Sequence, residues 1–132
     1  MNATDEKIKI KAFTDLIVWR EGHKLVVAIY RQTRSFPREE TYSLTDQMRR
    51  AAASVTSNIA EGFGRHSYRE KVQFYYQAQG SLTELKNQLI IARDVGYLNQ
   101  AAFSTLIDQA DTAHRLLQGF IAKSKSFIHQ KS

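Results

Sequence analysis

The chain has 132 residues, of which 42% are hydrophobic and 24% are charged, and this suits one globular domain with a single core. Cysteine is absent, which excludes disulfides and thiolate catalysis, and no apolar run is long enough to span a bilayer, so we expect a cytoplasmic protein without a membrane partner. The formal net charge of +6 is compatible with binding nucleic acid or an acidic partner, and equally with a basic surface that only keeps the protein soluble.

The first helix is predicted from about residue 15 to residue 35, after a flexible basic arm at residues 1–12. Thr14 is its candidate N-cap, and Phe36 and Pro37 follow its end. Two neighbouring apolar stripes run along this helix. We assign the first stripe to the core; it comprises Leu16, Trp19, His23, Val26, Tyr30 and Thr33. The second stripe indicates either an unusually wide core face or a subunit contact, and it supplies our candidate oligomer interface: Val18, Leu25 and Ile29.

The second helix is predicted from about residue 44 to residue 61, with Thr41 or Ser43 as its cap. Its second half and the corner after it read AAASVTSNIAEGFGR, at residues 51–65. The small residues let neighbouring helices approach closely, and the paired glycines end the helix at a basic corner. The expected inner face comprises Leu44, Met48, Ala51, Val55, Asn58 or Ile59, and Gly62.

The third helix begins at a capping box, because Ser67 is followed three residues later by Glu70. It extends to about Val95, with Gly96 as the residue that ends it. Gly80, in its middle, is interpreted as a close helix crossing. The expected inner positions are Tyr75, Ala78, Leu82, Leu85, Leu89 and Ala92.

The fourth helix is predicted from about residue 100 to residue 125, with Asn99 as its N-cap and a frayed basic tail at residues 126–132. Its inward positions are Phe103, Leu106 or Ile107, Ala110, Ala113 or His114, Leu117, and Phe120 or Ile121. Because the connections are short, successive helices should be antiparallel neighbours. The sequence therefore predicts an all-α protein whose residues 13–125 form an antiparallel up-down-up-down four-helix bundle.

Motifs for catalysis, metals and cofactors are missing. There is no Glu-x-x-His pair for a di-iron site, and Gly62 and Gly64 lack the strand and third glycine of a dinucleotide loop. We therefore expect no enzyme activity, no metal and no cofactor. Asn58, Glu61 and Glu84 indicate either a polar pocket or, as we favour, a structural network or salt bridges to arginines.

The densest basic corner lies between the second and third helices and contains Arg65, Arg69 and Lys71, with Tyr68 among them. A helix N-terminus also begins there, and its free N–H groups favour anions. Arg49 and Arg50, in the middle of the second helix, are further candidates, since at least one should face solvent or a partner. These five residues are the predicted nucleic-acid contacts, and a merely solvated corner is the alternative interpretation.

Several stretches together resemble a known family. They read F-x-D-L-x-V-W at residues 13–19, Q-M-R-R-A-A-x-S-V-x-S-N-I-A-E-G-F-G-R at 47–65, A-x-G-S-L-x-E-L at 78–85 and G-Y-L at 96–98. The chain resembles the four-helix bundle family of the 23S ribosomal RNA intervening-sequence proteins, sometimes labelled S23. The accessory variability protein of diversity-generating retroelements, which is associated with nucleic acid and a reverse transcriptase, looks like a structural relative.

The resemblance implies a bacterial bundle that assembles as a homopentamer, and it carries over no catalytic residues. Two functions follow as hypotheses. The first is a non-enzymatic pentamer that binds ribosomal RNA or DNA through basic surface residues, with five copies making a weak patch multivalent. The second is a protein interaction scaffold, for example an accessory subunit of a reverse transcriptase or polymerase, which makes no contact with nucleic acid itself.

Overall fold

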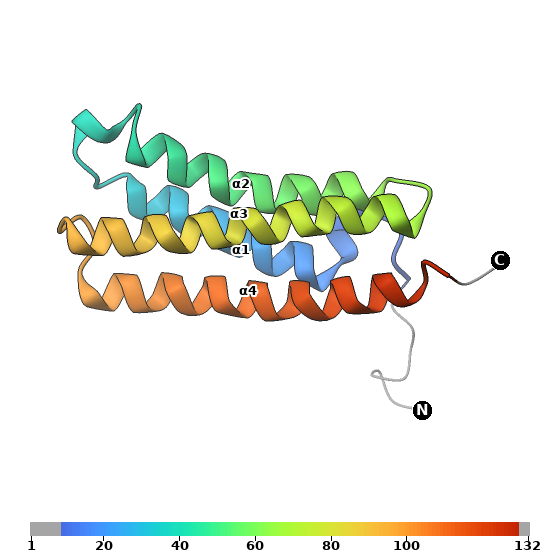
Figure 1. Ribbon diagram of the computed structural model, residues 1–132. Coiled ribbons are helices and arrows are strands. Elements are labelled where there is room, and N and C mark those ends of the chain that lie inside the picture. The colour runs from blue at the N-terminus through green and yellow to red at the C-terminus, as the bar shows by residue number, and fades with distance from the viewer. Residues whose placement is uncertain (1–8, 130–132) are drawn as a thin grey trace.

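Four long α-helices pack side by side in the computed structural model, which describes residues 9–129 (Figure 1). They are α1 (Ile17–Thr33), α2 (Leu44–Phe63), α3 (Tyr68–Asp94) and α4 (Gln100–Ser126), with short 3-10 turns η1 (Phe13–Asp15) and η2 (Arg38–Glu40) before α1 and α2. Each helix packs on the next one along the chain, and α1 also packs on α4. The predicted antiparallel four-helix bundle is confirmed.

Local capping chemistry sets several of the helix ends. The Ser67 hydroxyl accepts a hydrogen bond from the Glu70 backbone N–H at 3.1 Å, and the Asn99 side-chain oxygen accepts one from the Ala102 N–H at 2.7 Å. Gly96 ends α3 with a φ of 87°, a left-handed angle that glycine adopts at low steric cost. All three predicted caps are confirmed.

Two other predicted caps are wrong. At the start of α1, Leu16 and not Thr14 occupies the N-cap position, and no side chain caps this helix; the Asp15 carboxylate accepts hydrogen bonds from the backbone N–H groups of Lys11 and Ala12, which precede η1. At α2, Ser43 occupies the N-cap position but its side chain makes no cap bond. The Glu40 carboxylate accepts the hydrogen bond from the Leu44 N–H instead, at 3.2 Å.

The inner faces of α2, α3 and α4 largely match the prediction. Each contributes a stripe of side chains that lose almost all contact with solvent, and this burial is the main favourable term in the stability of a helical bundle. The largest fully buried side chains of these helices are Met48, Val55, Ile59, Tyr75, Leu82, Leu85, Leu89 and Leu117. Where the prediction named two alternatives, the buried residues are Ile59, Leu106, Ala113 and Ile121, and the half-buried ones are Asn58, Ile107, His114 and Phe120.

The predicted orientation of α1 is wrong. Val18, Leu25 and Ile29, our candidate oligomer interface, are 5%, 1% and 0% exposed and fill the core of a single chain, so they are not free to contact another subunit. Gly22 and Thr33 are buried on the same face. Of the stripe assigned to the core, only Leu16 and Thr33 are buried; Trp19 and Val26 are half-buried, and His23 and Tyr30 are exposed.

Two glycines allow close helix approach, but Gly80 is not one of them. A Cβ on Gly62 would lie 2.7 Å from Cε1 of Tyr75, and one on Gly22 would lie 3.1 Å from Cγ2 of Thr56. A Cβ on Gly80 would meet nothing within 4 Å, so the predicted crossing there is wrong. The tight crossings are therefore α1 with α2, and α2 with α3.

The predicted arm and tail fall partly outside the described part of the chain. Residues 1–8 and 130–132 lie beyond it, while residues 9–12 lead into η1 without regular structure and residues 127–129 form a turn after α4. None of the helices within residues 9–129 combines the length and hydropathy needed to cross a membrane.

Candidate nucleic-acid interface

One end of the bundle gathers much of the basic charge. The antiparallel topology brings together the start of α1, the α2–α3 corner and the end of α4 (Figure 1). Lys and Arg outnumber Asp and Glu there: the basic residues are Lys9, Lys11, Arg20, Arg65, Arg69, Lys71, Lys123 and Lys125, and the acidic residues are Asp15, Glu61 and Glu70. We call this surface the basic end. Its net charge is positive, and most of its side chains are exposed to solvent.

The three predicted contacts at the α2–α3 corner differ in whether their charged groups already interact with other residues. Arg69 is exposed and forms no ion pair with any residue in the described range. Arg65 pairs with Glu61 at 3.2 Å, and its guanidinium carbon lies 4.6 Å from the centre of the Phe74 ring. Lys71 is half-buried and donates a hydrogen bond to the Phe63 carbonyl at 2.6 Å. Burial lowers the pKa of the Lys71 ammonium from its ordinary value.

Arg49 and Arg50 do not belong to the basic end. They lie roughly 20 Å from Gly62 along the α2 axis, at 1.5 Å per residue. Arg49 ties α2 to α1: its Nε donates to the Thr33 hydroxyl at 2.9 Å, and its guanidinium lies over the Tyr30 ring. Arg50 pairs with Asp46 at 3.0 Å on the exposed face of α2. Arg49 is therefore a structural residue.

Asn58, Glu61 and Glu84 do not form one network. Asn58 donates to the Ser54 carbonyl and hydroxyl, and the Ser54 hydroxyl accepts a hydrogen bond from Ser81 on α3 at 2.9 Å. Glu61 is exposed and pairs with Arg65, whereas Glu84 accepts a hydrogen bond from Gln88 at 3.3 Å. These are three separate local interactions, and no polar pocket unites them.

Sequence reasoning did not find an apolar pocket of about 740 Å³ at the basic end. It lies between the start of α1, the start of α3 and the C-terminal part of α4. Aromatic residues form much of its wall, with Tyr75 and Phe120 in contact at 4.7 Å between ring centres. Burial raises the pKa of Tyr75 to about 12, with a smaller contribution from Tyr68. No single stretch of sequence indicates this pocket, because three distant segments build it.

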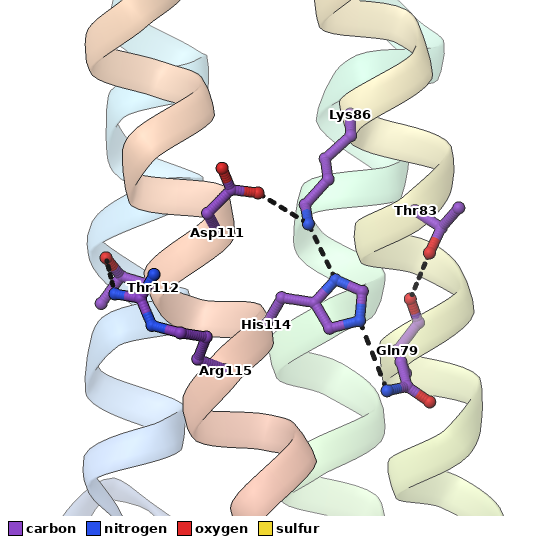
Figure 2. Close-up of polar contacts among 7 residues, drawn as sticks. All are labelled: Gln79, Thr83, Lys86, Asp111, Thr112, His114 and Arg115. Atoms are coloured by element: carbon purple, nitrogen blue, oxygen red, sulfur yellow. Dashed lines mark hydrogen bonds and ion pairs between the residues drawn. The ribbon is translucent and has the colours of Figure 1, made fainter.

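A polar cluster between α3 and α4 is the other feature that the sequence did not indicate (Figure 2). Lys86 Nζ lies 2.8 Å from Oδ1 of Asp111 and 2.9 Å from Nδ1 of His114. Nε2 of His114 faces the Gln79 side-chain amide at 3.3 Å. Because a Lys ammonium only donates, Nδ1 of His114 must accept, which places the ring hydrogen on Nε2. The acceptor for this hydrogen is the Gln79 side-chain oxygen, which takes the place of the amide nitrogen when the amide group is rotated by 180°.

The side chains of this cluster are not placed to hold a metal ion. Within residues 9–129 no group of three or more His, Asp or Glu side chains is placed to hold a metal ion. Burial first, and then the Lys86 charge, lower the pKa of His114, while Asp111 opposes them. These effects favour the neutral ring, which is part of a hydrogen-bonded bridge between the two helices.

Known proteins share the sequence pattern and the fold of this chain. The family model described as 23S rRNA-intervening sequence protein matches residues 14–119. A solved structure from Bacteroides thetaiotaomicron, described as a protein of unknown function from the S23 ribosomal protein family, superposes with a TM-score of 0.72 at 17% identity. The alignment covers 80% of this chain and 98% of that one. The search of curated proteins gave no significant match. Because the family model covers most of the bundle, the chain belongs to the 23S rRNA-intervening sequence protein family.

Proposed function

We propose that this protein is a non-enzymatic, homo-oligomeric bundle that binds nucleic acid, RNA or DNA, through phosphate contacts at its basic end. The observation that carries the proposal is the excess of exposed Lys and Arg at that end, with Arg69 free of any ion pair inside the described range. Phosphates are bound chiefly by such side chains, and the resulting affinity is independent of sequence.

The acidic residues of the basic end offset only part of its charge, since eight Lys and Arg residues face three carboxylates. The Asp15 carboxylate accepts hydrogen bonds from two backbone N–H groups and lies 3.9 Å from a guanidinium nitrogen of Arg20, and Glu70 accepts a hydrogen bond from the Ser67 hydroxyl. Only Glu61 forms an ion pair with a residue of the α2–α3 corner, Arg65. Arg69, Lys123 and Lys125 therefore keep their charge available for an external anion.

Oligomerisation is part of the proposal, with a pentamer as the expected form. Since Val18, Leu25 and Ile29 are buried within one chain, a contact through α1 would use its other apolar stripe. Trp19, Val26 and Tyr30 retain exposed surface there, and the His23 ring stacks on Trp19 at 4.8 Å. Repetition of the basic end in several copies would raise avidity for a long anionic chain.

The test is fluorescence anisotropy with a labelled ribosomal RNA fragment over a salt series, using wild type and two variants of equal net charge. Arg69→Gln removes a charge at the basic end, and Arg34→Gln removes an exposed charge at the opposite end. Arg69→Gln should weaken binding and reduce the slope of log affinity against log salt by about 0.7 to 0.9. Arg34→Gln should change neither, and equal effects of both variants would overturn the proposed location.

A second candidate function is a protein scaffold, for example an accessory subunit of a reverse transcriptase or polymerase. It is favoured by apolar side chains exposed at the end of α3, where Ile91 and Val95 are 42% and 55% exposed and one helical turn apart. Affinity capture from a nuclease-treated bacterial lysate separates the two functions. A protein partner that is retained after nuclease and lost in Ile91→Ser supports the scaffold.

A further inference from the structure

The apolar pocket at the basic end has the size and lining of a small-molecule site. Its volume of about 740 Å³ lies within the range of about 300–1,000 Å³ usual for ligand pockets. Phe63, Phe120 and Leu116 contribute to a mostly apolar wall. Ile17, at its edge, is 62% exposed, so apolar surface continues from the pocket to the outside. A ligand with a substantial apolar body would therefore remove this surface from water.

The polar groups of the pocket that remain available can all donate hydrogen bonds. Tyr75 lines the pocket, and its hydroxyl makes no hydrogen bond with any residue of the described chain, so it is available to a ligand. Lys123 also lines the pocket, as does Lys71, whose ammonium already donates one hydrogen bond to the Phe63 carbonyl. Lys123 forms no ion pair within residues 9–129.

Two acceptors at the pocket already have hydrogen-bond partners. Oδ2 of Asp15 accepts from the backbone N–H groups of Lys11 and Ala12, at 2.9 and 3.0 Å. The Ser124 hydroxyl donates to the Phe120 carbonyl at 2.8 Å. A ligand that complements this lining must supply acceptor atoms and negative charge at one end and apolar surface elsewhere.

We propose that this pocket binds a small amphipathic carboxylate, a molecule with one anionic head and an apolar body of the medium-chain fatty acid type. The carboxylate would lie near Lys123, Lys71 and the Tyr75 hydroxyl, with the apolar body against Phe63 and Phe120. The inference does not depend on nucleic-acid binding, since it rests on the pocket lining alone.

The probe is dodecanoate, titrated into the full-length protein by calorimetry below the concentration at which it forms micelles. Decanoate, which is two methylenes shorter, should bind roughly tenfold more weakly, as expected for buried apolar chain. Dodecyltrimethylammonium, with a like apolar chain and a positive head, should bind much more weakly than dodecanoate. Equal binding of the anion and the cation, or no binding of dodecanoate, would overturn the proposal.

Two glycines provide matched variants. Gly119 lines the pocket and Gly80 does not, and both have room for a side chain to begin, since a Cβ at either position would meet nothing within 4 Å. Gly119→Leu should reduce dodecanoate affinity at least tenfold by filling the pocket, while Gly80→Leu should leave it unchanged. Lys123→Gln, at an exposed side chain, should weaken dodecanoate binding and leave the weak binding of the cation undiminished. Wild-type affinity in Gly119→Leu would rule out this pocket as the site, whatever the outcome of the RNA measurements.

Discussion

Nζ of Lys86 lies 2.9 Å from Nδ1 of His114, and the same ammonium pairs with Asp111 at 2.8 Å, so one α3 side chain joins two α4 residues. The contact requires a neutral ring, because a proton on Nδ1 would face an ammonium that has only hydrogens to offer. The cluster therefore resists protonation in the folded state.

His114 should make the protein less stable as the pH falls. Its folded pKa lies below the ordinary 6.5, so the unfolded chain binds the proton more readily and stability decreases as the pH falls through 6.5 toward the folded value. Urea denaturation at pH 8 and pH 5 should show a larger loss for wild type than for His114→Gln. An NMR titration of the His114 ring that gives a pKa above 6.5 would contradict the expectation.

Gly62→Ala should destabilise the bundle by about 1–3 kcal/mol, the usual cost of overpacking. The new methyl group would lie 2.9 Å from Cβ of Phe74 and 3.1 Å from the Lys71 carbonyl oxygen, and backbone cannot move aside cheaply. Gly80→Ala is the control, since its methyl group enters open space; it should stabilise α3 by up to about 1 kcal/mol. The measurement is the free energy of unfolding in urea, and a neutral Gly62→Ala would show that α2 and α3 are less closely packed.

Arg49→Ala should cost about 1–2 kcal/mol of stability, because it removes the hydrogen bond to the Thr33 hydroxyl and the packing on Tyr30. Arg50→Ala removes the same charge from the next position, where the arginine side chain is 80% exposed. Its effect should stay within about 0.5 kcal/mol, as for other exposed ion pairs. Thermal unfolding of the two variants side by side checks the contrast, which equal midpoints would refute.

Tyr97→Phe should lower the free energy of unfolding at neutral pH, and it should lower it by a smaller amount in acid. The Tyr97 hydroxyl donates to Oε2 of Glu40 at 2.8 Å; this bond, and then the Leu44 N–H, lower the pKa of Glu40 from its ordinary 4.5. A lowered carboxyl pKa stabilises the fold above about 4.5 and ceases to do so as the pH falls through the folded value. The difference in unfolding free energy between wild type and Tyr97→Phe should therefore shrink from pH 7 to pH 3, and a constant difference would contradict this.

Much of the fold could be predicted because its signals are local. The Ser67 and Glu70 pair, Asn99 and Gly96 each define a helix end through hydrogen bonds or backbone angles within a few residues. Counting apolar residues could not tell which face of α1 packs into the core, since both of its stripes are apolar. Gly22 could have indicated the buried face. It continues the Val18 stripe at helical spacing and lies where α2 approaches closely.

The candidate site was less predictable. The corner with Arg65, Arg69 and Lys71 is contiguous in sequence, so its basic character could be predicted, but the burial of Lys71 depends on packing. The adjoining pocket and the Lys86–His114 contact join segments separated along the chain, and no spacing rule reveals such contacts. Gly80 shows the converse: a mid-helix glycine has the same appearance in sequence whether it faces a neighbour or solvent.

The short corner at residues 64–67 has a consequence for the order of folding. It lets α2 and α3 meet with little loop-closure entropy, and the hydrogen bond from Lys71 to the Phe63 carbonyl spans only eight residues. Contacts between α1 and α4 close far longer stretches of chain and so form at greater entropic cost. We therefore expect the α2–α3 hairpin to supply the folding nucleus, with α1 and α4 docking onto it afterwards.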